Sequence, residues 1–249
     1  MAGKALICAT AALLLSPVLI AADDGDDLTA RQLADQAKDN LLDAESVRLK
    51  LTDRGASATT SKTQPTSMEL ALDRDGNCVG SMRMGSGGGR VEIVKQGDEV
   101  WMKPDRTFWK AQVPGGQGEE VAELFENRYI HGSTKDAMLK GLADTCDLTA
   151  FQQDVEGDDG SEKTPLKKGE ETTVDGTKVI PLTGTEDGKR AILYVTSDSP
   201  HQLVRAVQRG EGTNTTLTFT DYDKPVPTAT PSADESVDVG KLQEELQKT

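Results

Sequence analysis

The chain has 249 residues, and its 28 Lys and Arg against 42 Asp and Glu give a formal net charge of -14. A chain this acidic lacks the basic face that phosphate binding requires, which argues against nucleic acid as a partner. It has only two histidines, His131 and His201, which we expect at the surface, so most histidine-based zinc sites and a catalytic triad are disfavoured.

The first 22 residues have the pattern of a secretory signal peptide. Lys4 is followed by an almost wholly apolar run over residues 5–20, and the small residues Ala21 and Ala22 precede an acidic segment at 23–27. The run is short for a membrane span and no basic flank follows it, so we expect cleavage and export. A retained signal anchor is the alternative. The three residues before Ala22 resemble the lead of a bacterial lipobox, but Ala22 stands where the acylated cysteine belongs, which predicts a secreted protein without a lipid anchor.

The two cysteines that remain after cleavage, Cys78 and Cys146, predict a disulfide, because an even pair in an exported protein is usually oxidised. Closing a loop of this length would stabilise the fold by roughly 4 kcal/mol. Two separate thiols are the alternative. A metal site would need more Cys or His nearby, so we expect no metal and no cofactor.

The first third of the mature chain predicts one helix and then strands. Apolar residues recur at helical spacing over residues 29–44, where Thr29-x-x-Gln32 has the form of a capping box. The pattern then alternates with period two at 46–52, 68–72 and 91–93, with glycine-rich or polar stretches between these runs. This alternation predicts an antiparallel meander with one buried face.

The middle of the chain predicts a strand pair at 98–103 and 108–112, helices at 119–129 and 134–143, a turn at 148–152 and an acidic surface loop at 156–163. Strands resume at 170–174, 178–182, 190–197, 203–210 and 213–222, with Asp175-Gly176 as a hairpin turn, and form a second meander. Residues 224–231 predict a proline-rich linker, and 240–249 an amphipathic tail helix.

No enzymatic motif is found in the chain. The glycine-rich stretch 85–89 is not followed by the Lys-Ser/Thr and helix of a phosphate loop, and no G-x-S-x-G pattern exists for a serine nucleophile. Asp73, Asp75 and Asn77 imitate the start of a calcium loop, but Cys78 stands where glycine is required. We therefore expect a protein that is not an enzyme.

The chain resembles the LolA-like lipoprotein carriers, most closely the actinobacterial LppX/LprG type. The resemblance is carried by Ser46-Val47-Arg48, by Gly97-Asp98-Glu99-Val100-Trp101-Met102-Lys103, and by Leu193-Tyr194-Val195 followed by Pro200-His201-Gln202-Leu203-Val204-Arg205. It implies an α+β fold in which a strongly curved antiparallel β-sheet forms a half-barrel and helices cover its concave face. In such relatives an apolar cavity carries acyl chains or acylated glycolipids across the cell envelope.

We expect a signal peptide at 1–22, an acidic segment at 23–27, and a proline-rich linker and flexible tail at 224–249, and the resemblance implies a LolA-like domain at 28–223. We expect a monomer that binds a lipid or other hydrophobic ligand. The alternative is an envelope sensory or interaction module on the same fold, with a membrane or envelope protein as partner. The apolar residues expected to line the cavity are Leu49, Leu70, Leu72, Ile93, Trp101, Leu124, Phe125 and Met138. In the sequence, these residues would serve a filled core equally well.

Overall fold

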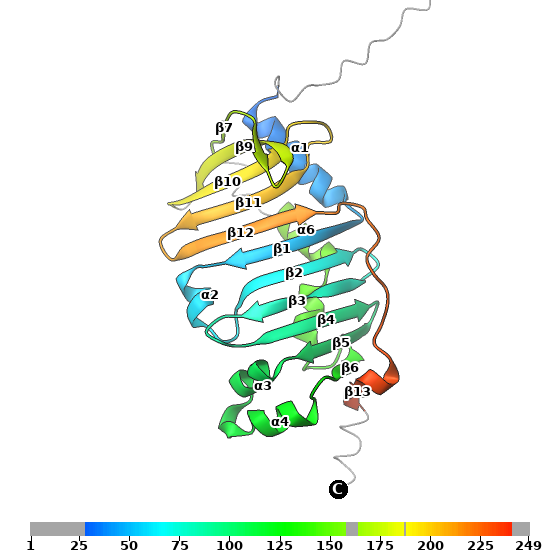
Figure 1. Cartoon of the computed structure of the whole chain (residues 1–249). Helices are drawn as coiled ribbons and strands as arrows, with labels where there is room; N and C mark the ends of the chain where they lie inside the picture. Colours follow the sequence, from blue (N-terminus) through cyan, green and yellow to red (C-terminus); the bar gives the residue numbers. More distant parts are fainter. Residues whose placement is uncertain (1–27, 158–163, 187, 241–249) are drawn as a thin grey trace, which may run out of the picture.

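The computed structural model describes residues 28–157, 164–186 and 188–240. The expected signal peptide, the acidic segment 23–27, most of the acidic loop and nearly all of the tail helix lie outside these residues. The described part contains six α-helices and one continuous, curved sheet of 13 strands, which does not close into a barrel (Figure 1). This confirms the predicted α+β half-barrel fold.

The first helix, α1 (Ala30–Asp43), begins at the predicted capping box. The Thr29 hydroxyl accepts a hydrogen bond from the Gln32 backbone N–H at 3.2 Å, and the Gln32 side chain accepts one from the Thr29 N–H at 2.9 Å. These two bonds satisfy N–H groups that have no partner within the helix. The helix buries Leu33, Ala37 and Leu41 against the sheet, as its 3.6-residue spacing predicts.

Both predicted meanders are present, and all of their neighbouring strands are antiparallel. The first meander runs through β1 (Ser46–Asp53), β2 (Pro65–Asp73), β3 (Cys78–Met84), β4 (Arg90–Gln96) and β5 (Glu99–Pro104), with a short helix α2 (Ala56–Thr60) after β1. The second runs through β7 (Lys167–Lys168), β8 (Thr172–Val174), β9 (Thr177–Glu186), β10 (Lys189–Thr196), β11 (Leu203–Gly210) and β12 (Thr213–Thr220). Pairing of β1 with β12 joins the two meanders into one sheet.

The segment 108–112, expected as a strand, lies in the helix α3 (Arg106–Gln112). The Asp105 carboxylate caps it by accepting a hydrogen bond from the Phe108 N–H at 2.7 Å, and such a cap favours a helix over a hairpin. Strand β5 therefore pairs with β6 (Tyr129–Ser133) instead. We predicted helix as far as residue 129, but α4 (Gly118–Leu124) ends earlier, before a left-handed turn at Asn127 (φ 59°).

The remaining helices of this region also differ from their predicted bounds. Asp136 accepts a hydrogen bond from the Ser133 N–H at 2.6 Å and holds a turn there, so α5 (Lys140–Thr145) starts later than expected. The expected turn at 148–152 is a full helix, α6 (Leu148–Glu156), capped by Asp147. A 3-10 turn, Pro114–Gly116, separates α3 from α4.

The segment after β12 runs past strands β1 to β5 to the end of the sheet formed by β6, where it adds a last strand (Figure 1). A 3-10 turn, Ala233–Glu235, leads into β13 (Ser236–Asp238), which pairs with β6 in the one parallel pairing of the described strands. Val226 and Val239 are buried on the way. Within the segment expected to be a linker and flexible tail, Val226 and residues 236–239 thus contact the domain, while most of 227–235 is exposed.

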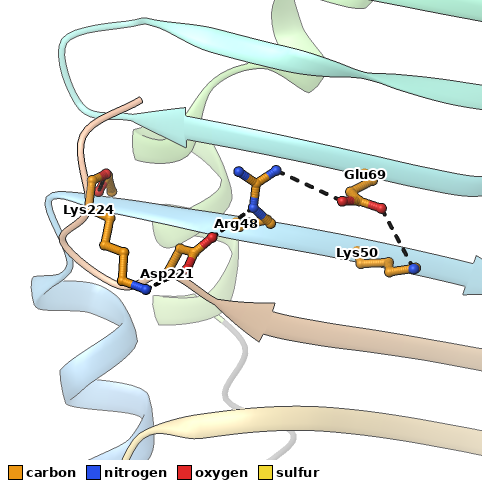
Figure 2. Close-up of polar contacts among 6 residues, drawn as sticks. Arg48, Lys50, Glu69, Asp221 and Lys224 are labelled. Carbon is orange, nitrogen blue, oxygen red and sulfur yellow. Dashed lines mark hydrogen bonds and ion pairs between the residues drawn. The ribbon is translucent and has the colours of Figure 1, made fainter. Parts of the chain in front are cut away.

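The two faces of the sheet differ in chemistry because side chains alternate along each strand. On the open face, Arg48 lies 2.8 Å from Asp221 and 3.9 Å from Glu69, and Glu69 also contacts Lys50 at 3.6 Å (Figure 2). Lys224 and Arg48 hold the pKa of Asp221 below its usual range. The covered face carries the neighbouring Val47 and Leu49, which are buried. The main core therefore lies on the covered face of the sheet.

Candidate functional site

An apolar cavity of about 420 Å³ lies between the helices α1 and α6 and the strands β9–β12. Its helical wall consists of the apolar side chains of Ala34, Ala37, Leu41, Phe151 and Val155. Its sheet wall consists mainly of the apolar side chains of Leu182, Ala191, Leu193, Leu203, Ala206, Leu217 and Phe219. A volume of this size falls within the range of small-ligand sites, about 300–1,000 Å³.

Short side chains explain why this part of the structure is not filled. Ala34 and Ala37 face the cavity from α1, and Ala191 and Ala206 line it from β10 and β11. An alanine side chain ends at Cβ, so it leaves empty the space that a leucine at the same position would occupy. Core packing normally eliminates such space, because dispersion contacts are lost around a void. The separation between α1 and the sheet must therefore be held by other contacts.

Gln152 supplies one of these contacts, since it fixes α6 to the end of α1. Its buried amide Nε2 donates to the backbone carbonyls of Leu41 and Ala44, both at 2.9 Å. Its Oε1 accepts a hydrogen bond from Arg74 at 3.2 Å. A buried amide with all of these partners is rigidly placed, because losing any of them would leave a polar group unsatisfied.

Three charged residues of α1 lie around the cavity: Arg31, Asp35 and Lys38. Arg31 donates a hydrogen bond to the carbonyl oxygen of Thr164 at 2.6 Å, and its guanidinium lies 3.9 Å from Asp35. Lys38 donates to the carbonyl oxygen of Glu156 at 3.2 Å. The cavity thus combines apolar walls with a polar rim, which is the arrangement of a site for an amphipathic molecule.

The predicted disulfide is present, and it lies in the other half of the molecule. Cys78 at the start of β3 is bonded to Cys146 at the end of α5, with an S–S distance of 2.06 Å and a Cα–Cα distance of 5.6 Å. Both cysteines are fully buried. The bond ties the helical segment between β6 and β7 to the first meander, which closes the covered face there.

No family model and no curated protein matches this chain in sequence. Among solved structures, the chain is similar to the lipoprotein LppX from Mycobacterium tuberculosis, with 16% identity and a TM-score of 0.50 over 80% of this chain and 98% of LppX. It is also similar to LprF from Mycobacterium bovis, with 15% identity and a TM-score of 0.53 over 82% of this chain and 97% of LprF.

The chain has the LppX-type fold. This confirms, for the fold, the resemblance that the sequence motifs indicate. Within the described residues, no helix has the length and apolarity to cross a membrane, and no cluster of three or more Cys, His, Asp or Glu side chains is arranged to hold a metal ion.

None of the eight residues that we predicted for the cavity lines it. Leu49, Leu70, Leu72 and Ile93 do come together on the covered face, but their exposed fractions are 6%, 0%, 1% and 1%, and they belong to a filled core. The helices that follow β5 and the disulfide close over this half of the sheet. In this LppX-type fold the hollow lies instead over the second meander.

The other four predicted residues lie at the edge of that core or outside it. Phe125 packs on Trp109, with ring centroids 5.6 Å apart. Leu124 and Met138 are 65% and 56% exposed, because Leu124 is the last residue of α4 and Met138 lies in the turn before α5. The alternation of β5 turns the neighbours of Trp101 inward, so Trp101 lies on the open face. There it stacks on a histidine, with ring centroids 4.5 Å apart.

We expected both histidines at the surface, but neither is fully exposed there. His201 is buried, and its Nδ1 lies 3.0 Å from the carbonyl oxygen of Thr196. His131 is the half-buried partner of Trp101 and lies 2.5 Å from the Glu99 carboxylate. Both therefore have structural partners.

Proposed function

We propose that this protein is a non-enzymatic extracytoplasmic carrier that binds a lipid or acylated glycolipid through an acyl chain in the cavity. The observation that carries the proposal is the apolar hollow between α1, α6 and β9–β12, which four alanines leave unfilled. The LppX-type fold supports the extracytoplasmic part of the proposal, because LppX is a lipoprotein. The proposal requires no catalytic step, metal or cofactor, and the carrier acts as a monomer without nucleic acid.

The physical basis of binding is the transfer of methylene groups from water to the cavity walls. Each methylene buried there contributes roughly 0.8 kcal/mol. An acyl chain of about ten carbons would then contribute about 8 kcal/mol, which is in the middle of the range of about 4–15 kcal/mol for the cost of immobilising the ligand, and each further methylene adds to it. Tight binding therefore needs no charged group, and the three charged residues of the lining, Arg31, Asp35 and Lys38, all come from α1.

A cavity-filling variant tests the proposal. Ala206→Trp would place an indole in the hollow, so the dissociation constant for a fluorescent fatty acid should rise by roughly tenfold or more, which is 1.4 kcal/mol or more of binding free energy. The melting temperature should change little, because the indole enters empty space rather than a packed core.

Thr218→Trp is the matched control, because Thr218 pairs with Arg205 on the open face of the same two strands. It should leave the dissociation constant unchanged. If Ala206→Trp also leaves it unchanged while the protein stays folded, the carrier proposal fails and the interaction module becomes the better account.

Export without a lipid anchor is a separate part of the proposal. It rests on the apolar run at 5–20 and on Ala22 at the position of the lipobox cysteine. N-terminal sequencing and intact-mass measurement of the exported protein should give an unacylated chain that begins near Asp23. A retained Met1 or an acylated residue would contradict this.

A further inference from the structure

We infer that the open face of the sheet carries an oxyanion site, formed by Arg83 and Arg90, for a terminal phosphate group. Its ligand class is inorganic phosphate or a phosphate monoester. The site lies on the face opposite the cavity, so the inference goes beyond the carrier proposal and does not rest on it. Three observations carry it: two arginines that face each other, the absence of carboxylate partners for them, and a polar depression beside them.

The two arginines are directly opposite each other on neighbouring strands. Arg83 of β3 pairs with Arg90 of β4, next to the loop 85–89. Their neighbours Met82 and Val91 are buried, so the alternation of both strands turns the arginines to the open face, where both are exposed. The Cβ atoms of such a pair are about 4.5–5.5 Å apart, and like charges at this separation destabilise a sheet. An anion bound between the two guanidinium groups would remove this repulsion.

The carboxylates around this pair are engaged by other groups. Glu69 lies between two cations of β1, at 3.6 and 3.9 Å (Figure 2). Glu92 lies 3.3 Å from Lys103, and the Asp105 carboxylate caps α3. Within the described ranges of the chain, neither arginine of the pair forms an ion pair, although the sequence has 42 acidic residues. Both guanidinium charges therefore remain for an anion from outside the chain.

A polar depression of about 310 Å³ lies beside the arginines on β1–β4, and the hydroxyl groups of Ser67 and Ser81 are part of its lining. Arg90 Nη2 donates a hydrogen bond to Ser81 Oγ at 3.1 Å, which orients this guanidinium. A guanidinium has several N–H donors in a fixed fork, so Arg90 retains donors for a second acceptor. Arg83 lines the same depression, so both guanidinium groups can donate to one ligand there.

The backbone that carries the two arginines is also fixed. The Gly85 N–H donates to the carbonyl oxygen of Gln64 at 2.9 Å, and the Ser86 N–H donates to that of Thr59 at 3.0 Å. These bonds tie the loop 85–89 to α2 and to the segment that follows it. The hairpin therefore holds the arginines opposite each other before a ligand binds, and binding does not have to order the backbone.

The charge and the donors fit a terminal phosphate better than a carboxylate. A carboxylate carries one negative charge, and a single guanidinium can satisfy it with two parallel hydrogen bonds. A terminal phosphate carries a charge of about -1.5 to -2 at pH 7 and has three strong acceptor oxygens. Two guanidinium groups and two serine hydroxyl groups match both the charge and the number of oxygens.

Titration with inorganic phosphate at constant ionic strength, followed by ¹H–¹⁵N NMR, tests the inference. The amide signals of Ser81, Arg83 and Arg90 should shift and reach saturation, whereas acetate should cause smaller shifts that do not saturate over the same range. Arg83→Gln/Arg90→Gln should raise the dissociation constant for phosphate by about tenfold or more, because two ion pairs are lost. The melting temperature should not fall, because both side chains are exposed.

Arg190→Gln/Arg209→Gln is the matched control. Arg190 and Arg209 are also exposed and directly opposite each other on the open face, but on β10 and β11, away from the depression on β1–β4. The control removes the same charge and should leave the dissociation constant for phosphate unchanged. An equal loss of affinity in the control, or no saturable shift with phosphate in the unaltered protein, overturns the inference and leaves the carrier proposal standing.

Two further ligands identify the source of the phosphate group. Vesicles of phosphatidylcholine with phosphatidate present a phosphate monoester on a lipid surface, and glycerol 3-phosphate presents one in solution. Co-sedimentation with these vesicles that is lost in Arg83→Gln/Arg90→Gln supports the site and assigns it to a lipid head group. Saturable binding of glycerol 3-phosphate without co-sedimentation supports the site and assigns it to a soluble phosphate. Failure of both ligands to bind overturns the inference.

Discussion

Replacing Cys78 and Cys146 together by alanine is expected to lower the free energy of unfolding by about 4 kcal/mol. The disulfide joins residues 68 positions apart, so its removal gives the unfolded chain a large gain in conformational entropy. Both sulfur atoms are also buried, and the variant loses their packing. Urea unfolding followed by fluorescence or circular dichroism would measure the change.

Two controls make this result specific to the disulfide. A reducing agent should destabilise the unaltered protein and leave the double variant unaffected. Met138→Ala, in the same helical segment but 56% exposed, should change the free energy of unfolding by less than about 0.5 kcal/mol. A loss below 1 kcal/mol in the double variant would show that the disulfide contributes little to the folded state.

The Leu70→Ala variant is expected to lose about 2–5 kcal/mol of stability and to bind a fluorescent fatty acid as tightly as the unaltered protein does. Leu70 has no exposed surface, and it lies on the covered face beside Leu49 on the neighbouring strand. Removing its isobutyl group leaves a void in a packed core, at a residue that does not line the hollow. Thermal or urea unfolding and a binding titration measure the two quantities.

Leu193→Ala is the matched comparison, because Leu193 is a half-buried leucine of the cavity wall. It should cost less stability than Leu70→Ala and should alter the binding of the probe. The reverse result, with weakened binding in Leu70→Ala and no change in Leu193→Ala, would place the ligand under the first meander.

Most of the sheet could be predicted from the sequence, because alternation along a strand is a local signal. Val47 and Leu49 alternate with Arg48, and the structure places them on opposite faces. The Thr29 capping box and the Asp175-Gly176 turn are local as well, and Asp175 and Gly176 both have positive φ, as a tight hairpin requires. Local signals of this kind fix strands and turns before any tertiary contact is known.

The region between β5 and β7 was harder to predict, because its signals are short. Phe108 and Trp109 fit a strand as well as a helix, and the deciding contact is the cap from Asp105. Strand β6 has five residues, too few for alternation to stand out from the helix pattern before it. Strand β6 pairs with β5, and this edge of β5 is open to it because 106–112 forms a helix instead of a strand.

The location of the cavity could not be derived from the alternating pattern, because inward leucines look the same over a core and over a hollow. Leu72 and Leu193 both lie on the covered face of the sheet, yet only Leu193 lines the cavity. The signal that does distinguish them is the inward alanine at 191 and at 206, together with Ala34 and Ala37 on the facing helix. Four small residues on two facing surfaces indicate unfilled space only when the pairing of those surfaces is known.

The pairing of β1 with β12 also determines when the protein can finish folding. Leu49 of β1 lies beside Phe219 of β12. Strand β1 can therefore form this pairing only after β12, near the end of the chain, has been synthesised. Contacts over such sequence distances slow folding, because the loop-closure entropy is lost before the pairing compensates for it. Until then β1 presents an unpaired edge beside β2, and such an edge can pair with another chain.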